Sequence, residues 1–364
     1  MTTRSLLQRA LDLVRAEWRH LTTFNPSTRR WQMPFAAALA SGLPLMVGAW
    51  FDHLEYGLIS SIGGLVFLYL PNTPLSHRMV WLMACGFGMS ASYALGLMTH
   101  FLPLANVAVL GLIAMLVTMV CRFYRVGPPG SLFFVMAAAI GAYTPGTVED
   151  IPLRVGLITM GALLASAIAF CYSLYILRLQ APEPVAPLPP PTFDFVVFDA
   201  VMIGAFVGLS LAIAQALQLD RPYWVPVSCL AVIQGVSLRA VWNRQLQRVL
   251  GTAAGMLLAW GLLSLPLDPW RIALLVIALA FTIETLVVRH YGLAVIFITP
   301  LTLLLAEAAT LGHAPIADLI QSRFIDTLLG CVVGLVGGIC LHSARFRDVV
   351  GGPLRRLIPR RPQS

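Results

Sequence analysis

The stretch 154-RVGLITMGALLASAIAFCYSLYIL-177 decides the fold class, because no charged side chain follows Arg154 within it. A helix needs about 20 mostly apolar residues to cross a hydrocarbon core of about 30 Å, and this stretch is long enough. Shortly after it, 181-APEPVAPLPPP-191 places six prolines in eleven residues, which predicts a stiff extended linker. The sequence therefore predicts a membrane-spanning helix that leads into a linker outside the bilayer.

The composition of the whole chain agrees with a protein surrounded by lipid. Of its 364 residues, 58% are hydrophobic and 11% are charged, whereas soluble domains carry about 25% charged residues. A soluble chain of this composition could not cover its surface with polar groups, and lipid removes that requirement. The six cysteines and seven histidines show no CxxC or metal-ligand spacing, so we expect no metal and no cofactor.

Twelve apolar segments divide the chain into two halves. We place them at 33–51, 55–71, 79–99, 103–121, 130–144, 154–177, 198–218, 222–238, 248–266, 269–288, 290–309 and 324–342. The predicted organisation is an amphipathic N-terminal helix (1–30), a first six-helix half (31–180), a Pro-rich linker (181–197), a second six-helix half (198–343) and a basic tail (344–364). The expected fold is thus an all-α polytopic membrane protein with about twelve transmembrane helices.

The arginines test this topology, because all 24 basic side chains are arginine. With the N-terminus in the cytoplasm, twenty of them face that side, and only Arg154, Arg221, Arg271 and Arg323 face the other. The positive-inside rule demands such a division. We therefore expect a bacterial inner-membrane protein with both termini cytoplasmic, with arginines next to an anionic inner leaflet. The net charge of +8 then gives no reason to expect nucleic acid.

Local matches between the halves predict an internal duplication. Tyr56 and Tyr223 open the second segment of each half, 167 positions apart, and Arg78 and Arg244 precede the third segments, 166 positions apart. An even number of spans per half makes the two six-helix repeats parallel, related by an axis along the membrane normal.

The second and fifth segments of each half carry helix breakers. Gly63-Gly64, Pro226, 127-GPPG-130 and Thr299-Pro300 lie in or beside these segments. Paired broken helices at corresponding positions indicate a transport site, although glycine and proline also serve ordinary packing in membrane helices.

Charged and aromatic side chains supply the candidate site residues. Glu284 and Glu307 fall well within predicted spans and are candidate proton-coupling acids; alternatively, Glu284 meets cytoplasmic arginines and Glu307 reaches water. Arg244 and Arg248, four residues apart, present two guanidinium groups at the cytoplasmic end, either to gather anions or to anchor the inner leaflet. Tyr223 and Trp224 lie at an interface, where aromatic belts are common and substrate stacking is the alternative.

Three stretches of the second half resemble the fusaric acid resistance protein-like family. They are 222-PYWVPVSCLAVIQ-234, 244-RQLQRVLGTAAG-255 and 289-RHYGLAVIFITPL-301, although His290 stands where the family usually has Asn. The resemblance covers roughly 200–342. The candidate pathway residues are Arg78, Tyr223, Trp224, Gln234, Arg244, Arg248, His290, Tyr291, Thr299 and Pro300.

The family includes bacterial inner-membrane exporters of aromatic carboxylic acids and is more distantly similar to plant aluminium-activated malate channels. The resemblance implies export of small organic anions and a periplasmic adaptor as partner. Many such exporters carry a large cytoplasmic domain, whereas this chain has only a linker between its halves. Glycine spacings such as Gly330, Gly334 and Gly338 would equally suit a homo-oligomer.

The leading functional hypothesis is a secondary transporter that exports aromatic carboxylates, with proton coupling by one of the two glutamates. An organic-anion channel and a non-transporting membrane scaffold for envelope assembly are the alternatives. The sequence contains no P-loop, no nucleophile elbow and no HExxH, so an enzyme is not expected.

Overall fold

The computed structural model describes residues 23–188, 190, 192–307 and 315–356, and within these ranges every regular element is a helix. The α-helices are α2 (Gln32–Trp50), α3 (Leu54–Gly64), α4 (Leu75–Thr99), α5 (Asn106–Phe123), α6 (Leu132–Tyr143), α7 (Ile151–Ile176), α8 (Asp199–Ala216), α9 (Trp224–Ile233), α10 (Leu238–Leu263), α11 (Pro269–Leu286), α12 (Tyr291–Glu307), α13 (Ile316–His342) and α14 (Ala344–Arg356). Short helical turns are η1 (Leu65–Tyr69), η2 (Pro103–Ala105), η3 (Val148–Asp150) and η4 (Asp194–Phe198).

Eight of these helices are long and apolar enough to cross a membrane. They are α2, α4, α10, α11 and α13, together with α5, α7 and α8 when their preceding turns are included. By its helix composition the chain is therefore a multi-pass membrane protein. The other four predicted segments coincide with shorter apolar helices, namely α3 with η1, α6, α9 and α12, so the count of twelve spans stays a prediction.

Two of the four short helices are bounded by residues that disfavour helix. Helix α6 begins after Pro128-Pro129 and ends before Pro145, whereas α9 follows Pro222 and ends before Gly235. The ten residues of α9 rise by only about 15 Å, about half of a hydrocarbon core. Breaks at that depth persist where protein or a water-filled cavity satisfies the backbone.

Two predicted breaks are wrong in detail. Pro226 lies in the first turn of α9, where proline is tolerated, and α12 continues through Pro300. The predicted break at Gly63-Gly64 is confirmed, because α3 ends there and continues as the 3₁₀ turn η1.

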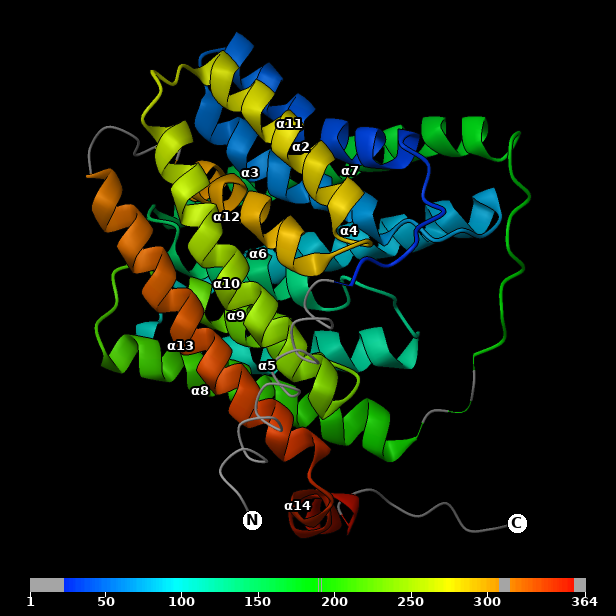
Figure 1. Ribbon diagram of the computed structural model, residues 1–364, viewed down its shortest axis with the longest axis vertical. Coiled ribbons are helices and arrows are strands. Elements are labelled where there is room, and N and C mark those ends of the chain that lie inside the picture. The colour runs from blue at the N-terminus through cyan, green and yellow to red at the C-terminus, as the bar shows by residue number, and fades with distance from the viewer. Residues whose placement is uncertain (1–22, 189, 191, 308–314, 357–364) are drawn as a thin grey trace, which may run out of the picture.

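Each half of the chain has its own set of long helix–helix contacts. Helix α4 packs against α6 and α7, and α10 packs against α12 and α13; α3 packs against α7, and α9 against α13. The halves meet along two long contacts, α2 with α11 and α5 with α8, and the first of these is visible at the top of Figure 1.

Glycines allow some of these helices to approach closely. A Cβ atom on Gly251 would lie 2.7 Å from the carbonyl oxygen of Gly292, and one on Gly255 would lie 2.6 Å from that of Ile296. Such distances leave no room for a side chain, so the glycine spacing on α10 serves its contact with α12.

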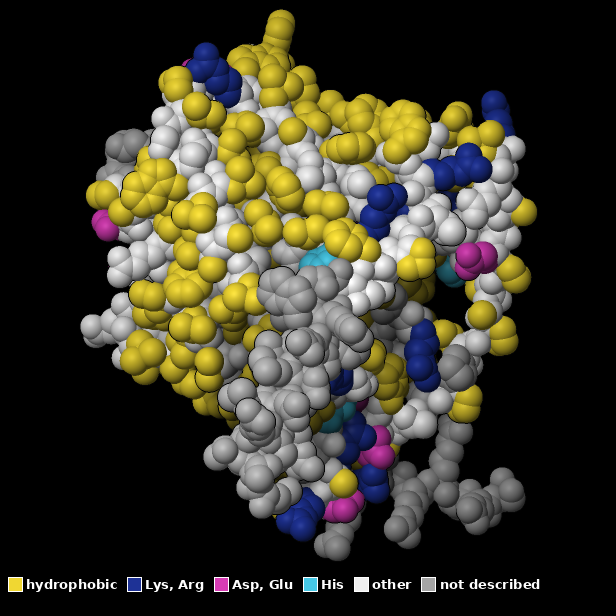
Figure 2. All heavy atoms as spheres, viewed as in Figure 1, with side chains coloured by type: hydrophobic (Ala, Val, Ile, Leu, Met, Phe, Trp, Pro, Cys, Tyr) yellow, Lys and Arg dark blue, Asp and Glu magenta, His cyan; other side chains and the backbone are white. Residues whose placement is uncertain are grey.

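The surface separates apolar from basic regions. Large hydrophobic side chains such as Phe87, Leu257 and Val80 are each more than 70% exposed, as expected for groups that face lipid. In Figure 2 hydrophobic side chains cover most of the face in view, while most of the visible arginines gather toward the linker and α14. The linker runs along one side of the molecule between α7 and η4 (Figure 1).

Several predicted boundaries differ from the structure. Most of the expected N-terminal helix lies outside the described residues, and residues 23–30 are not helical. The linker ends earlier than predicted, since η4 begins at Asp194, and the basic tail begins with the helix α14. Helix α13 begins at Ile316, eight residues before the expected span, so Arg323 lies inside this helix instead of just before it.

Candidate functional site: a cavity lined by the four short helices

A cavity of about 1130 Å³ runs through the helical bundle. The four short helices line it along their lengths: Tyr56 to Leu65 on α3 and η1, Leu132 to Tyr143 on α6, Trp224 to Ala231 on α9, and Tyr291 to Leu305 on α12. Helix α11 adds a further wall near Val276 and Glu284. The cavity therefore lies where the helices are too short to fill the depth of a bilayer, and most of its wall is apolar.

Arginines occupy one end of the cavity, where α5 and α11 end and α10 begins. We call this the arginine-rich end; its lining arginines are Arg29, Arg122, Arg125 and Arg244. Arg29 pairs with Glu284 at 3.0 Å. The guanidinium groups of Arg122 and Arg125 lie 4.6 and 4.4 Å from the centre of the Phe195 ring, which favours the cations by cation–π attraction.

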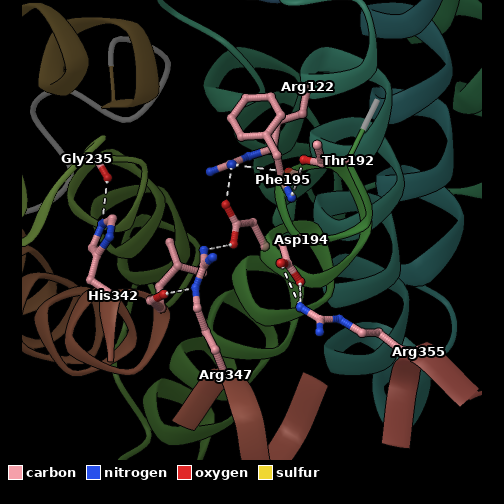
Figure 3. A network of polar contacts seen from close by, with 10 residues as sticks. Arg122, Thr192, Asp194, Phe195, Gly235, His342, Arg347 and Arg355 are labelled. Atoms are coloured by element: carbon pink, nitrogen blue, oxygen red, sulfur yellow. Dashed lines mark hydrogen bonds and ion pairs between the residues drawn. The ribbon is translucent and has the colours of Figure 1, made fainter. Parts of the chain in front are cut away.

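A network of polar contacts around Asp199 joins α5, η4, α8 and α14 beside this end (Figure 3). Asp199 accepts a hydrogen bond from Arg122 at 2.5 Å and another from Arg347 of α14 at 2.6 Å. A second arginine of α14, Arg355, bonds both oxygens of Asp194 at 2.6 and 2.7 Å. The C-terminal helix is thus tied to the start of α8, next to an arginine that lines the cavity.

Arg248 lies deeper in the cavity wall, on α10. It is 6% exposed and donates hydrogen bonds to the Tyr291 hydroxyl and to the Ser228 hydroxyl, both at 3.1 Å. Its Nε atom has no hydrogen-bond partner. The two acceptors come from α12 and α9, so three helices hold this guanidinium group in place.

Arg323 lies in the same cavity wall, on α13. It is 3% exposed, and its guanidinium carbon lies 3.7 Å from the centre of the Trp224 ring. Its Nη2 donates to the Thr302 hydroxyl at 3.2 Å, whereas Nε and Nη1 have no partner. Trp224, which the sequence offered as an interfacial or stacking residue, supports this cation.

Neither Arg248 nor Arg323 forms an ion pair with a carboxylate of the described residues. A buried charge without a counter-charge carries an effective desolvation penalty of several kcal/mol. A carboxylate ligand would accept the unused N–H groups and supply the missing negative charge, since guanidinium groups bind carboxylates by charge-assisted hydrogen bonds. The site is therefore suited to an anion with an apolar body.

The opposite end of the cavity contains tyrosines and one arginine that is already bonded. The rings of Tyr143 and Tyr223 lie 5.8 Å apart. Arg154 donates to the Pro145 carbonyl oxygen at 2.6 Å and lies 3.8 Å from Asp150. Among the described lining residues, Arg154 therefore has a carboxylate beside it, whereas the arginine-rich end holds four arginines.

The structure brings seven of the predicted site residues to the cavity. They are Tyr223, Trp224, Gln234, Arg244, Arg248, Glu284 and Tyr291. Gln234 donates to the Ser131 hydroxyl at 2.8 Å, and Arg244 lies 5.9 Å from the centre of the Tyr291 ring.

The remaining predicted residues lie elsewhere, except for one that cannot be placed. Arg78, His290, Thr299 and Pro300 do not line the cavity. His290 accepts the Leu293 N–H at 3.1 Å at the start of α12, and the Thr299 hydroxyl bonds the Val295 carbonyl. The side chain of Glu307 lies outside the described residues.

Sequence reasoning did not single out Arg323 or Asp326 as site residues, and it named neither Asp199 nor Asp326 among the carboxylates of the predicted spans. Asp199 and Asp326 are buried in α8 and α13, at 5% and 1% exposure. The signal was present, since an arginine and an aspartate three residues apart at the start of an apolar run suit one helix face. The described residues contain no group of three or more His, Cys, Asp or Glu side chains that could hold a metal.

Comparison with known proteins relates the second half of the chain to a family. Residues 200–337 match the family described as fusaric acid resistance protein-like. Over 96% of its length the chain is 22% identical to "Uncharacterized membrane protein YvaC" of Bacillus subtilis (strain 168), of which 78% is covered. No solved structure matches.

Proposed function

Since residues 200–337 carry a fusaric acid resistance protein-like domain, a family associated with efflux and resistance, we propose that this chain is a secondary transporter of small organic anions. The proposed cargo is an aromatic carboxylate, which enters the arginine-rich end and is exported. The proposed setting is a bacterial inner membrane with both termini in the cytoplasm, where a periplasmic adaptor or a second copy of the chain would be a partner.

The observation that carries this proposal is the pair of buried arginines in the cavity wall. Arg248 and Arg323 have N–H groups without partners and no ion-paired carboxylate among the described residues. A carboxylate between them would relieve that imbalance, and an aromatic body would contact the apolar walls that α3, α6, α9 and α12 provide.

We further propose that the chain forms two parallel six-helix repeats with twelve crossings. The support is the correspondence of contacts, because α2, α3, α4 and α7 pack as α8, α9, α10 and α13 do. The two seams between the halves also correspond, α2 on α11 and α8 on α5, and each has an arginine–carboxylate pair near the arginine-rich end: Arg29 with Glu284, and Arg122 with Asp199.

Flux in proteoliposomes tests the transport proposal. The purified protein should carry labelled benzoate and salicylate across the bilayer faster than protein-free vesicles do, and a pH gradient should change the accumulated level. Replacing Arg248 and Arg323 together by Gln should lower the rate about 100-fold, since each contact to a charged group is worth about 1.5–3 kcal/mol. The control Arg271→Gln removes an equally charged but exposed side chain.

The outcomes separate the alternatives. Saturable flux that never accumulates benzoate against its gradient would indicate a channel. A folded protein without any flux would contradict transport and would favour the alternative of a non-transporting membrane scaffold. Equal flux in the double variant and the Arg271→Gln control would contradict the binding site.

A further inference from the structure

Asp326 is the buried carboxylate nearest in sequence to the proposed anion site. It lies three residues after Arg323 on α13, so the two side chains share one face of the helix. Asp326 is 1% exposed and its Oδ2 atom has no hydrogen-bond partner. The hydroxyl of the next residue, Thr327, is also buried and without a partner.

Asp326 and Arg323 are opposite charges that do not bond each other. Two guanidinium nitrogens of Arg323, Nε and Nη1, have no hydrogen-bond partner, yet no ion pair joins Arg323 to Asp326 or to any other described carboxylate. Two such groups in a dry site favour direct pairing unless something else competes for one of them. The arrangement fits an arginine that is shared between an internal carboxylate and an external anion.

The charged groups around Asp326 limit the choice of proton acceptor. Asp326 interacts electrostatically with Arg323 and with Asp220 and Arg221 in the turn before α9. Arg323 in turn interacts with Arg248 of α10 and with the Tyr223 phenol. The other candidate within the described residues, Glu284, is held by Arg29 at 3.0 Å. Glu284 thus has an ion-paired arginine, whereas Asp326 forms no ion pair with Arg323 and its Oδ2 atom has no hydrogen-bond partner.

Resting on the proposed function, we propose that Asp326 is the proton-coupling acid and that a proton and an organic carboxylate occupy the site together. An anion bound to Arg323 repels the ionised Asp326 carboxylate and favours its neutral form. By reciprocity, protonation of Asp326 removes the negative charge that repels the anion, and it strengthens anion binding by the same factor. The proton and the anion then move in the same direction as a neutral pair.

This mechanism fixes the sign of the coupling. Because the pair carries no net charge, the membrane potential does not act on the completed step. A pH gradient drives the anion toward the alkaline side, and at equal pH the net movement follows the concentration gradient of the substrate alone. Export against a more alkaline cytoplasm therefore requires a cytoplasmic substrate excess that outweighs the pH gradient. A proton antiporter would show the opposite response to the pH gradient.

Calorimetry of benzoate binding tests the proposal on the full-length protein in detergent. Titrations between pH 6 and 8 in two buffers with different ionisation enthalpies give the number of protons taken up per bound benzoate, while benzoate itself stays ionised. We expect the unmodified protein to take up as much as one proton, and its dissociation constant to rise with pH by at most about tenfold per unit, the limit for one linked proton.

Matched variants assign the proton. Asp326→Asn should bind benzoate with no proton uptake and no pH dependence, and Asp326→Glu should restore both. In Glu284→Gln the uptake of a proton with benzoate should persist, whatever the change in affinity. Asp326→Ser replaces the Asn variant if the latter elutes as an aggregate in size-exclusion chromatography. Proton uptake that persists in Asp326→Asn or Asp326→Ser, or that disappears in Glu284→Gln, would overturn the assignment. Binding without proton uptake in the unmodified protein would overturn the coupling alone, whereas no binding at all would overturn the proposed function with it.

Discussion

Two buried arginines, one in each half of the molecule, show what separates a structural cation from a ligand-binding one. Arg78 of α4 is 2% exposed and donates to three oxygens: the Thr73 carbonyl at 2.6 Å, the Asn72 side chain at 3.0 Å and the Ser173 hydroxyl at 3.2 Å. Arg323 is 3% exposed and donates to one. Burial is thus the same, and the number of satisfied N–H groups differs.

The difference extends to their surroundings. Arg78 lies off the cavity and helps hold the turn before α4 against α7, because its partners come from residues 72–73 and from Ser173. Arg323 lines the cavity and rests on the ring of Trp224. A cation whose donors are used by its own fold stabilises that fold, whereas one with unused donors is available to an anion.

The largest expected effect is the loss of Arg78. Arg78→Met should lower the free energy of unfolding by about 3 kcal/mol, because it removes three hydrogen bonds from a buried charged donor and leaves their acceptors without that partner. Thermal unfolding in detergent measures it, with the exposed Arg271→Met as control. Equal melting temperatures for the two variants would contradict the claim that Arg78 stabilises the fold.

A smaller loss is expected where an arginine is satisfied by a carboxylate. Asp199→Asn should lower the free energy of unfolding by about 2 kcal/mol, since it weakens the bonds to Arg122 and Arg347, which are themselves partly exposed. Asp268→Asn is the matched control, because Asn still caps the start of α11 in place of Asp268. A similar melting temperature for both would mean that the Asp199 network adds nothing to stability.

The change in the free energy of unfolding should have the opposite sign when Arg323 is replaced. Arg323→Met removes a buried, incompletely paired charge and keeps an apolar stem, so the free energy of unfolding should rise by about 1 kcal/mol. Benzoate binding by the same variant should fall at least about tenfold. A destabilised Arg323→Met variant would show that Arg323, like Arg78, serves the fold.

The smallest effect concerns a single partner of Arg248. Tyr291→Phe removes the hydroxyl that accepts from Arg248 at 3.1 Å, and the free energy of unfolding should fall by about 0.5–1 kcal/mol. Tyr175→Phe, at a half-exposed ring, is the control in the same thermal assay. A loss of several kcal/mol would place Arg248 with Arg78 on the structural side of the comparison.

The sequence predicted the eight long helices well, because about 20 apolar residues in a row have one low-energy arrangement in lipid. It also placed helix breakers correctly beside two of the segments that prove short, at 63–64 and 127–130, whereas α9 and α12 continue through the breaks predicted at Pro226 and Pro300. Helix boundaries were predicted less well than the helices themselves. The start of α13 at Ile316 was missed because Arg323 and Asp326 interrupt the apolar run.

The candidate site was predicted in part. Arg244, Arg248 and the Tyr223-Trp224 pair were singled out as charged or aromatic groups near helix ends, and they line the cavity. Arg78 was singled out by the same argument and does not. Arg323 was placed just outside an expected span, because a span predicted from a run of apolar residues ends wherever an arginine interrupts that run.

The amino-acid sequence alone determined that this chain is helical, lies in a membrane and carries its charge as arginine, because these properties follow from composition and hydrophobic length. Only the tertiary structure decided which arginines are satisfied, since their acceptors come from helices far apart in the chain. A hydrogen bond such as that from Arg323 of α13 to Thr302 of α12, or a free N–H beside it, exists only once the helices have packed.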